Sequence, residues 1–258
     1  MNAVPDLGAL VATDLRRAQA LIAGARRIVV LTGAGMSAES GIPTFRQARA
    51  ALWADFDPMQ LASPEGFRAD PPRVWSWYAW RREKVAGALP HAGYFALAAA
   101  AQCFEQMVLI TQNVDGLHER AGSRNVIELH GNILRTTCFA QCGVRIDDPG
   151  ALPPGVPPRC PRCGSHLRPD VVWFGEMLDA ALLAQAERAA SDCEVMLVVG
   201  TSALVYPAAG LPALAARSGA AIITINPEAT EIDPIARICL RAAAAQALPQ
   251  LFGGDNAV

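Results

Sequence analysis

Short apolar runs, each ending at a glycine or a small polar residue, recur along the chain. They lie at residues 28–31, 108–110, 195–199 and 222–225, and are followed by Thr32-Gly33, Thr111, Gly200 and Asn226. Such short runs, rich in β-branched residues, are typical of strands buried on both faces of a parallel sheet. Helix-like stretches lie between them, at residues 14–25, 93–103, 179–190 and 207–217. The alternation predicts an α/β fold with a Rossmann-like, doubly wound parallel sheet, in which ligands bind beyond the carboxyl ends of the strands.

Two stretches interrupt this alternation. Residues 49–89 are rich in tryptophan and look helical, and residues 133–172 combine four cysteines with the proline-rich run LPPGVPPRCPRCG. We predict one domain over residues 1–258, with a helical insert at 49–89 and a metal-binding module at 133–175. These two would form a small lobe beside a Rossmann-like large lobe. The large lobe would take residues 20–48, 90–132 and 176–258.

The cysteines identify the kind of metal. Four of the seven lie as two close pairs, Cys138 with Cys142 and Cys160 with Cys163, and seventeen residues separate the pairs. This spacing predicts a tetrahedral Zn²⁺ site of the zinc-ribbon type. Four thiolates leave no open position for water, so we expect one structural ion. The alternatives are four buried cysteines without metal, and a ribbon that binds nucleic acid.

Composition excludes several classes of protein. Hydrophobic residues make up 52% and charged residues 18% of the 258 positions, which excludes an intrinsically disordered chain. The net charge of −2 and the lack of an aromatic and basic motif argue against a nucleic-acid partner. No apolar run approaches the roughly 20 residues of a membrane span, and no basic leader precedes an apolar stretch. We therefore expect a cytoplasmic protein without a membrane partner.

The first glycine cluster follows a predicted strand and occupies residues 32–38, with the sequence TGAGMSA. Small residues in such a loop let backbone N–H groups approach a pyrophosphate, although many similar loops are only tight turns. A dehydrogenase would also need an acidic residue on a second strand about 20 residues later. Asp55 and Asp57 are near that distance but lie in an aromatic stretch that contains proline. The loop therefore favours dinucleotide binding without favouring hydride transfer.

Six ordered segments carry a resemblance to a known family. They are GAGMSAESGIPTFR (33–46), TQNVDGLHERAG (111–122), ELHG (128–131), VVWFGE (171–176), VVGTSALVYPAAG (198–210) and TINPE (224–228). The set resembles the sirtuins, NAD-dependent protein lysine deacylases, and extends from about residue 20 to 250. The resemblance implies that NAD is a co-substrate that the enzyme cleaves.

In the reaction that the resemblance implies, the acyl-lysine carbonyl oxygen attacks C1′ of the nicotinamide ribose and nicotinamide leaves. A ribose hydroxyl, deprotonated by a histidine, then closes onto the imidate, and hydrolysis yields lysine and O-acyl-ADP-ribose. The matching base is His130, since a neutral imidazole suits proton abstraction at neutral pH. The alternative is a structural histidine at a strand end, which is the role that we expect for His118.

Asn113 and Asp115 match the residues that hold the nicotinamide carboxamide and ribose, and we expect both to act in catalysis. An amide donates and accepts hydrogen bonds together, as a carboxamide partner requires; the alternative is an Asx turn after a strand. Further NAD contacts are implied for Gly33, Ala34, Gly35, Ser37, Phe45, Arg46, Gln112, Gly200, Thr201, Ser202, Asn226 and Ala244. Ala244 departs from the family, which often has Gly-Pro and a small residue near the adenine.

Tyr78 and Arg81 are spaced to lie on one face of a predicted helix. An Arg fork beside a phenol suits a carboxylate. The Tyr-x-x-Arg spacing resembles the desuccinylase and demalonylase (class III) branch, which implies removal of succinyl, malonyl or glutaryl groups as well as acetyl. The alternative is that Tyr78 packs among the tryptophans and Arg81 is a solvated helix charge.

Residues 172–176 and 203–205 match the segments between which sirtuins hold an extended acyl-lysine peptide by backbone hydrogen bonds. The implied substrate contacts are Val172, Phe174, Gly175, Glu176 and Val205. We expect broad use of protein substrates and a monomer. Three other functions stay open here: a sirtuin-fold protein ADP-ribosyltransferase, an NAD-binding module without turnover, and a Rossmann-type oxidoreductase.

Overall fold

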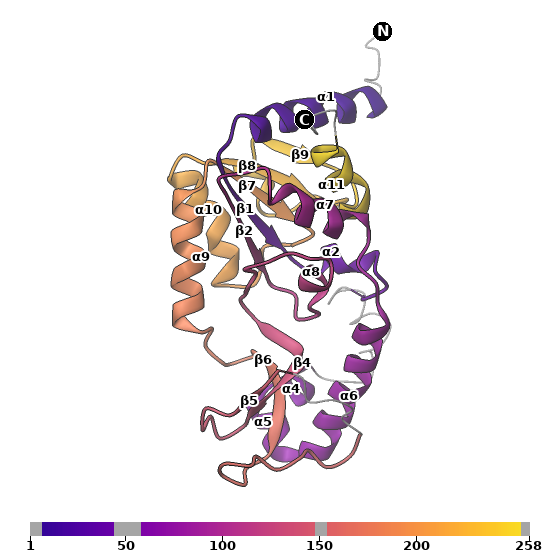
Figure 1. Ribbon diagram of the computed structural model, residues 1–258, viewed down its shortest axis with the longest axis vertical. Helices are drawn as coiled ribbons and strands as arrows, with labels where there is room; N and C mark the ends of the chain where they lie inside the picture. The colour runs from indigo at the N-terminus through magenta and orange to yellow at the C-terminus, as the bar shows by residue number, and fades with distance from the viewer. Residues whose placement is uncertain (1–6, 44–57, 148–153, 254–258) are drawn as a thin grey trace.

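The computed structural model describes residues 7–43, 58–147 and 154–253. Figure 1 shows an elongated molecule, with a six-stranded sheet and its helices at the upper end and a three-stranded sheet at the lower end. The N-terminal helix α1 (Leu7–Ala23) lies at the top, far from the small sheet.

The large sheet is parallel throughout, with strand order β3-β2-β1-β7-β8-β9. Its strands are β1 (Arg27–Thr32), β2 (Gln106–Thr111), β3 (Ile127–Glu128), β7 (Val195–Val199), β8 (Ala221–Ile225) and β9 (Ile238–Leu240). In chain order, β2 and β3 follow β1 toward one edge of the sheet, and β8 and β9 follow β7 toward the other edge. The strand order therefore reverses between β1 and β7, which is where doubly wound folds bind ligands.

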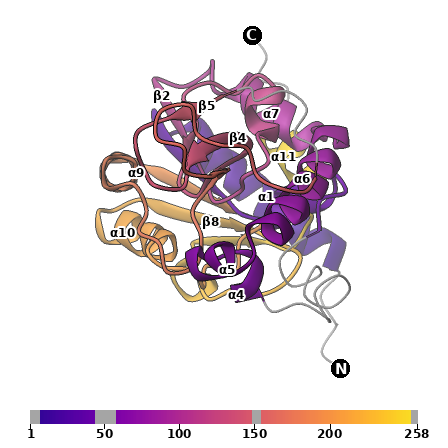
Figure 2. The ribbon, with the colours of Figure 1, turned by 90° about the horizontal axis from the view of Figure 1, so that it is seen from below.

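Helices cover both faces of this sheet. The helices α1, α7 (Ala92–Ala100) and α11 (Ala244–Phe252) pack on one face, and α9 (Ala180–Asp192) and α10 (Leu211–Arg217) pack on the other. Figure 2 shows these two groups on opposite sides of β8. Successive residues of β1 point to alternate faces, so both faces of this central strand are apolar and buried.

The small sheet is antiparallel, in the order β5-β4-β6, and consists of β4 (Gly131–Cys138), β5 (Arg145–Ile146) and β6 (Leu167–Val171). Three helices pack beside it: α4 (Pro58–Leu61), α5 (Pro64–Ala69) and α6 (Pro71–Gly87). Side chains of Ser63 and Asp70 cap the N-termini of α5 and α6. One hydrophobic cluster joins the helices to the sheet through Phe67, Tyr78, Ile133 and Trp173.

The predicted α/β fold with a doubly wound parallel sheet and a smaller lobe is confirmed. Sequence analysis missed β3 and β9, which have two and three residues and are too short for a periodicity to show. The residue boundaries of the two lobes stay a prediction. In the described part of the chain no helix is both long and apolar enough to cross a membrane.

Candidate active site

The loops after β1 and β7 touch at the carboxyl edge of the large sheet. The Gly33 N–H donates to the Val199 carbonyl (3.0 Å) and the Gly35 N–H to the Gly200 carbonyl (2.7 Å). A Cβ atom on Gly33 would lie 2.6 Å from the Thr201 Cβ, and one on Gly200 would lie 2.4 Å from the Met36 nitrogen. Gly200 also has a φ of +60°. These glycines are therefore needed for the contact between the two loops themselves, in addition to any approach of a phosphate.

Asn113, Asp115 and Ser37 form a buried hydrogen-bonded group beside this contact. The Asn113 amide donates to the Gly33 carbonyl (2.9 Å) and to Ser37 Oγ (2.8 Å), and Ser37 Oγ donates to Asp115 Oδ2 (2.6 Å). Burial raises the pKa of Asp115. Its other oxygen, Oδ1, accepts from the Leu117 N–H (2.9 Å), which is an Asx turn. Asp115 thus makes the Asx turn of the alternative interpretation, and its Oδ2 in addition accepts from Ser37.

Tyr94 belongs to the same group and was missed by sequence analysis. Its hydroxyl lies 3.0 Å from Ser37 Oγ, and its ring centroid lies 4.7 Å from that of His118. His118 is buried with Nε2 at 3.0 Å from Thr32 Oγ1, and burial lowers its pKa to about 3. A histidine that stays neutral in such a place is suited to the structural role that we expected.

His130 has one ring nitrogen committed and one available. Nδ1 lies 2.9 Å from the Gln112 carbonyl oxygen. A carbonyl only accepts, so Nδ1 carries the proton in the neutral ring and Nε2 keeps the lone pair. Burial lowers the pKa of His130 and so favours this neutral form. The arrangement leaves the Nε2 lone pair available and orients the ring through Gln112, the residue that follows β2.

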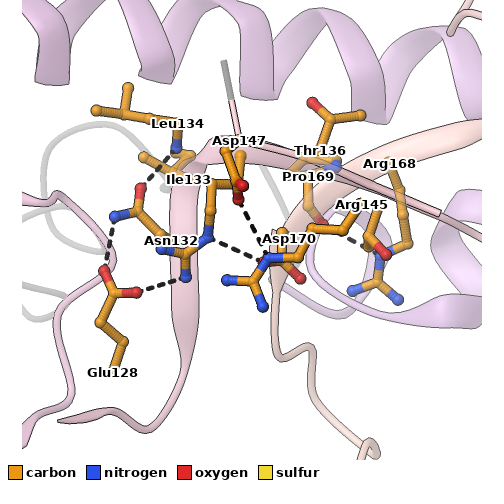
Figure 3. Close-up of polar contacts among 12 residues, drawn as sticks. Glu128, Asn132, Ile133, Leu134, Thr136, Arg145, Asp147, Arg168, Pro169 and Asp170 are labelled. Carbon is orange, nitrogen blue, oxygen red and sulfur yellow. Dashed lines mark hydrogen bonds and ion pairs between the residues drawn. The ribbon is translucent and has the colours of Figure 1, made fainter. Parts of the chain in front are cut away.

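Ion pairs and a hydrogen bond join residues on either side of the turn that carries His130, and Figure 3 shows Glu128, Asn132 and Asp170 among them. The Glu128 carboxylate accepts from Asn132 Nδ2 (2.6 Å) and pairs with Arg135 Nη2 (2.5 Å), while Arg135 Nε reaches Asp170 Oδ2 at 3.2 Å. The Val172 N–H donates to the His130 carbonyl (2.9 Å). The sequence carried no signal for these contacts, because they join β3, β4 and β6.

The other predicted NAD contacts are spread along this edge of the sheet. The Gln112 amide donates to Thr201 Oγ1 (3.1 Å), and Asn226 Nδ2 donates to the Thr201 carbonyl (3.3 Å). Ala34 precedes the single turn α2 (Gly35–Ala38), and Ser202 is exposed. Ala244, the first residue of α11, is buried against α7, where its carbonyl would lie 2.8 Å from a Cβ on Gly93. Phe45 and Arg46 lie outside the described residues.

Tyr78 and Arg81 lie on α6 among aromatic rings. The ring of Tyr78 packs 4.6 Å from that of Trp77, and its hydroxyl accepts a hydrogen bond from Trp173 Nε1 (2.8 Å). The guanidinium carbon of Arg81 lies 4.7 Å from the Trp77 ring centroid and 5.6 Å from that of Tyr78. Burial lowers the pKa of Arg81, whereas Tyr78 and Asp115 act in the opposite direction. Tyr78 therefore packs among tryptophans, as in the alternative interpretation, whereas the half-buried Arg81 lies against the same rings.

The segment after β6 is only partly available for a peptide. The Phe174 side chain of this segment is exposed, and so is Val205 in the loop after β7. The N–H groups of Val172 and Phe174 already donate to the carbonyls of His130 and Ala62. The Glu176 carboxylate binds the Arg168 guanidinium and accepts from the Trp173 N–H. Within the described chain, Gly175 is the residue of this segment whose N–H has no protein acceptor.

The four clustered cysteines fit a structural zinc ion. All four sulfur atoms lie within 4.8 Å of one another, and the pairs Cys138–Cys163 and Cys142–Cys160 are each 3.5 Å apart. Tetrahedral Zn–S bonds of about 2.3 Å separate sulfurs by roughly 3.8 Å, so small shifts would complete the site. Cys138 ends β4, whose first residue, Gly131, follows His130.

Comparisons with known proteins identify the family. The profile of the Sir2 family matches residues 33–207. The chain is 50% identical over 239 residues to an NAD-dependent protein deacylase of Methylococcus capsulatus, covering 88% of this chain and 92% of that protein. It is 48% identical over 247 residues to NAD-dependent protein deacylase 1 of Pseudomonas aeruginosa, covering 92% and 98%. A solved Sir2 homologue in complex with NAD superposes with a TM-score of 0.87 at 47% identity, covering 92% of each chain. The chain belongs to the Sir2 family, the sirtuins.

Proposed function

We propose that this sirtuin is an NAD-dependent protein lysine deacylase that removes acetyl groups and the acidic groups succinyl and malonyl. The products would be nicotinamide, O-acyl-ADP-ribose and free lysine. The observation that carries the proposal is His130, whose Nδ1 is held by the Gln112 carbonyl so that Nε2 is free to accept a proton. Relatives that are named NAD-dependent protein deacylases support it.

In the proposed reaction His130 Nε2 takes the proton of a ribose hydroxyl as that hydroxyl attacks. Asn113 and Asp115 would hold the nicotinamide end of NAD, and Ser37 keeps their side chains together. Gln112, Thr201 and Asn226 are joined by hydrogen bonds across the switch point of the sheet, so we assign the riboses and phosphates to that edge, with Gly33, Gly35 and Gly200. The Zn²⁺ would stabilise the small lobe and take no part in the chemistry.

The pH dependence of deacylation should follow the protonation state of the His130 imidazole. A general base must be neutral, and burial lowers the pKa of this imidazole, so protonation should inactivate the enzyme only below the ordinary value of about 6.5. We expect kcat/KM to fall as the pH drops through this lowered pKa, in a range where circular dichroism shows an intact fold. An acid limb centred at or above about pH 6.5 would contradict the assignment.

The charge of Arg81 supports the acidic-acyl part of the proposal. Among the described residues no aspartate or glutamate forms an ion pair with this guanidinium, and the Arg81 side chain is half-buried. The neighbouring Arg82 instead donates to the Ile133 and Arg135 carbonyls and to Thr136 Oγ1. Partial burial of a cation carries a desolvation cost, and a carboxylate on the acyl group would supply a counter-charge. The influence of Asp115 on the pKa of Arg81 is consistent with a position near the reacting end of NAD.

The experiment compares one peptide carrying acetyl-lysine or succinyl-lysine, with and without NAD, by mass spectrometry. We expect NAD-dependent loss of both groups, with succinyl removed faster. Arg81→Met should raise KM for the succinyl peptide about tenfold to a hundredfold, and much less for the acetyl peptide, because a charge-assisted pair is lost.

The matched control is Lys84→Met, which removes an exposed positive charge from the same helix. Equal effects of Arg81→Met on the two peptides would refute the carboxylate role and leave the deacetylase. Transfer of the ADP-ribose label to protein, without loss of an acyl group, would favour the transferase. NAD binding without any product would favour the binding module.

For substrates, we propose extended acyl-lysine peptides lying between the loop after β6 and residues 203–205, with the exposed Phe174 and Val205 beside them. The Gly175 N–H is the donor that this pairing would use. We also propose a monomer, located in the cytoplasm, where reducing conditions keep four thiolates available for zinc.

A further inference from the structure

The hydrogen bond between Trp173 and Tyr78 joins residues from two distant parts of the chain. Tyr78 lies on α6 and Trp173 follows β6, and each is only 2% exposed. Their rings lie 6.2 Å apart at the centroids, and Trp173 Nε1 is 2.8 Å from the Tyr78 hydroxyl oxygen. The contact is therefore buried, within the cluster that joins the helices to the small sheet.

The chemistry of the two groups determines the direction of this bond. An indole N–H can only donate, so the phenol oxygen must accept, and the hydroxyl proton of Tyr78 has to point elsewhere. A buried hydroxyl that has already accepted from Trp173 is available to a further partner chiefly as a donor. Carboxylate oxygens only accept, so they suit that remaining position.

Trp173 is itself held from two sides. The Arg168 guanidinium carbon lies 3.4 Å from the Trp173 ring centroid, and Arg168 makes a two-pronged ion pair with Glu176. Glu176 Oε2 also accepts from the Trp173 backbone N–H at 2.8 Å. The indole therefore has little freedom to turn its N–H away from Tyr78.

Arg81 adds a second donor beside the Tyr78 hydroxyl. Its guanidinium lies over the rings of Trp77 and Tyr78 and has no acceptor sites of its own. An acetyl group offers no oxygen beyond the amide, whereas a succinyl or malonyl group ends in a carboxylate. A substitution that acts through the Tyr78 hydroxyl should thus lower activity on succinyl or malonyl peptides more than activity on acetyl peptides.

We infer that Trp173 is a positioning residue for acyl specificity: its indole N–H holds the Tyr78 hydroxyl so that the phenol proton is offered to the carboxylate of an acidic acyl group. The inference rests on the proposed removal of acidic acyl groups. It assigns a role to a residue that would touch neither NAD nor the reacting atoms.

The test is a double-mutant cycle with Trp173→Phe, Tyr78→Phe and the two combined, read as kcat/KM on succinyl and acetyl peptides. Each single change should lower the ratio of succinyl to acetyl activity about threefold to tenfold, the usual worth of one net hydrogen bond. The double variant should lose no more than Tyr78→Phe alone, because Trp173 acts through that hydroxyl. Trp80→Phe on the exposed side of the same helix should leave the ratio unchanged.

Additive losses in the double variant, or equal loss on both peptides with Trp173→Phe, would overturn the inference. If Trp173→Phe lowers the melting temperature strongly, benzothienylalanine at position 173 removes the N–H and keeps the bicyclic ring, and the same loss of ratio is expected. Should Arg81→Met and Tyr78→Phe lower the ratio while neither Trp173 variant does, the inference falls and the proposed function stands. If Arg81→Met and Tyr78→Phe leave the ratio unchanged, the inference and the acidic-acyl part of the proposed function both fall, and the deacetylase remains.

Discussion

Replacing His130 with alanine is expected to lower deacylation of both acetyl and succinyl peptides by about 10²- to 10⁴-fold, the usual contribution of a general base. The variant loses the lone pair of Nε2, whereas the groups proposed to hold NAD keep their own contacts. Asn113 stays bonded to Gly33 and Ser37, and Gln112 to Thr201. Calorimetric titration should therefore find NAD affinity nearly unchanged.

A suitable control is His166→Gln, since His166 lies in the small sheet region with Nδ1 near the Pro157 carbonyl and has no part in the proposed chemistry. Turnover retained by His130→Ala would remove this residue as the base. A loss of NAD binding together with activity would instead point to collapse of the turn that Glu128 and Arg135 hold.

Loss of zinc should have the next largest effect. Cys160→Ser is expected to abolish metal binding and to unfold the small lobe, because structural zinc contributes about 10–16 kcal/mol in small metal modules. The core of this module is small: within the described residues only Cys138, Cys160 and Leu167 form its buried cluster. Metal analysis should find about one Zn per chain in the unaltered protein, and thermal denaturation should show the loss of stability.

The zinc prediction also has a consequence for catalysis. β4 runs from Gly131, next to His130, to the metal ligand Cys138, so unfolding of the module should free the catalytic turn and abolish activity. Cys103→Ser is the matched control, since Cys103 is exposed and lies outside the cysteine cluster. A stable protein that contains no metal would refute the site.

Much of the fold and of the proposed site could be predicted from local patterns. The apolar runs that became β1, β2, β7 and β8 are buried on both faces, so each run is continuous and easy to recognise. The glycine loop, the ELHG segment and the paired cysteines are each specified within a few neighbouring residues. The conformational freedom of the glycines and the spacing of the metal ligands are both properties of a short stretch of sequence, so a local pattern is enough to predict them.

The remaining features depend on contacts between residues far apart in the chain. Trp173 and Tyr78 are 95 positions apart, and Ser37 and Tyr94 are 57 apart. The sequence around each of these residues does not show which hydrogen bond will form, because the two partners are brought together only by folding of the chain. The chain alone thus indicates the family and the metal, and it predicts His130 as the base. The orientation of His130 and the partial burial of Arg81 arise from packing, because long-range contacts determine which polar atoms lose water and which stay exposed to it.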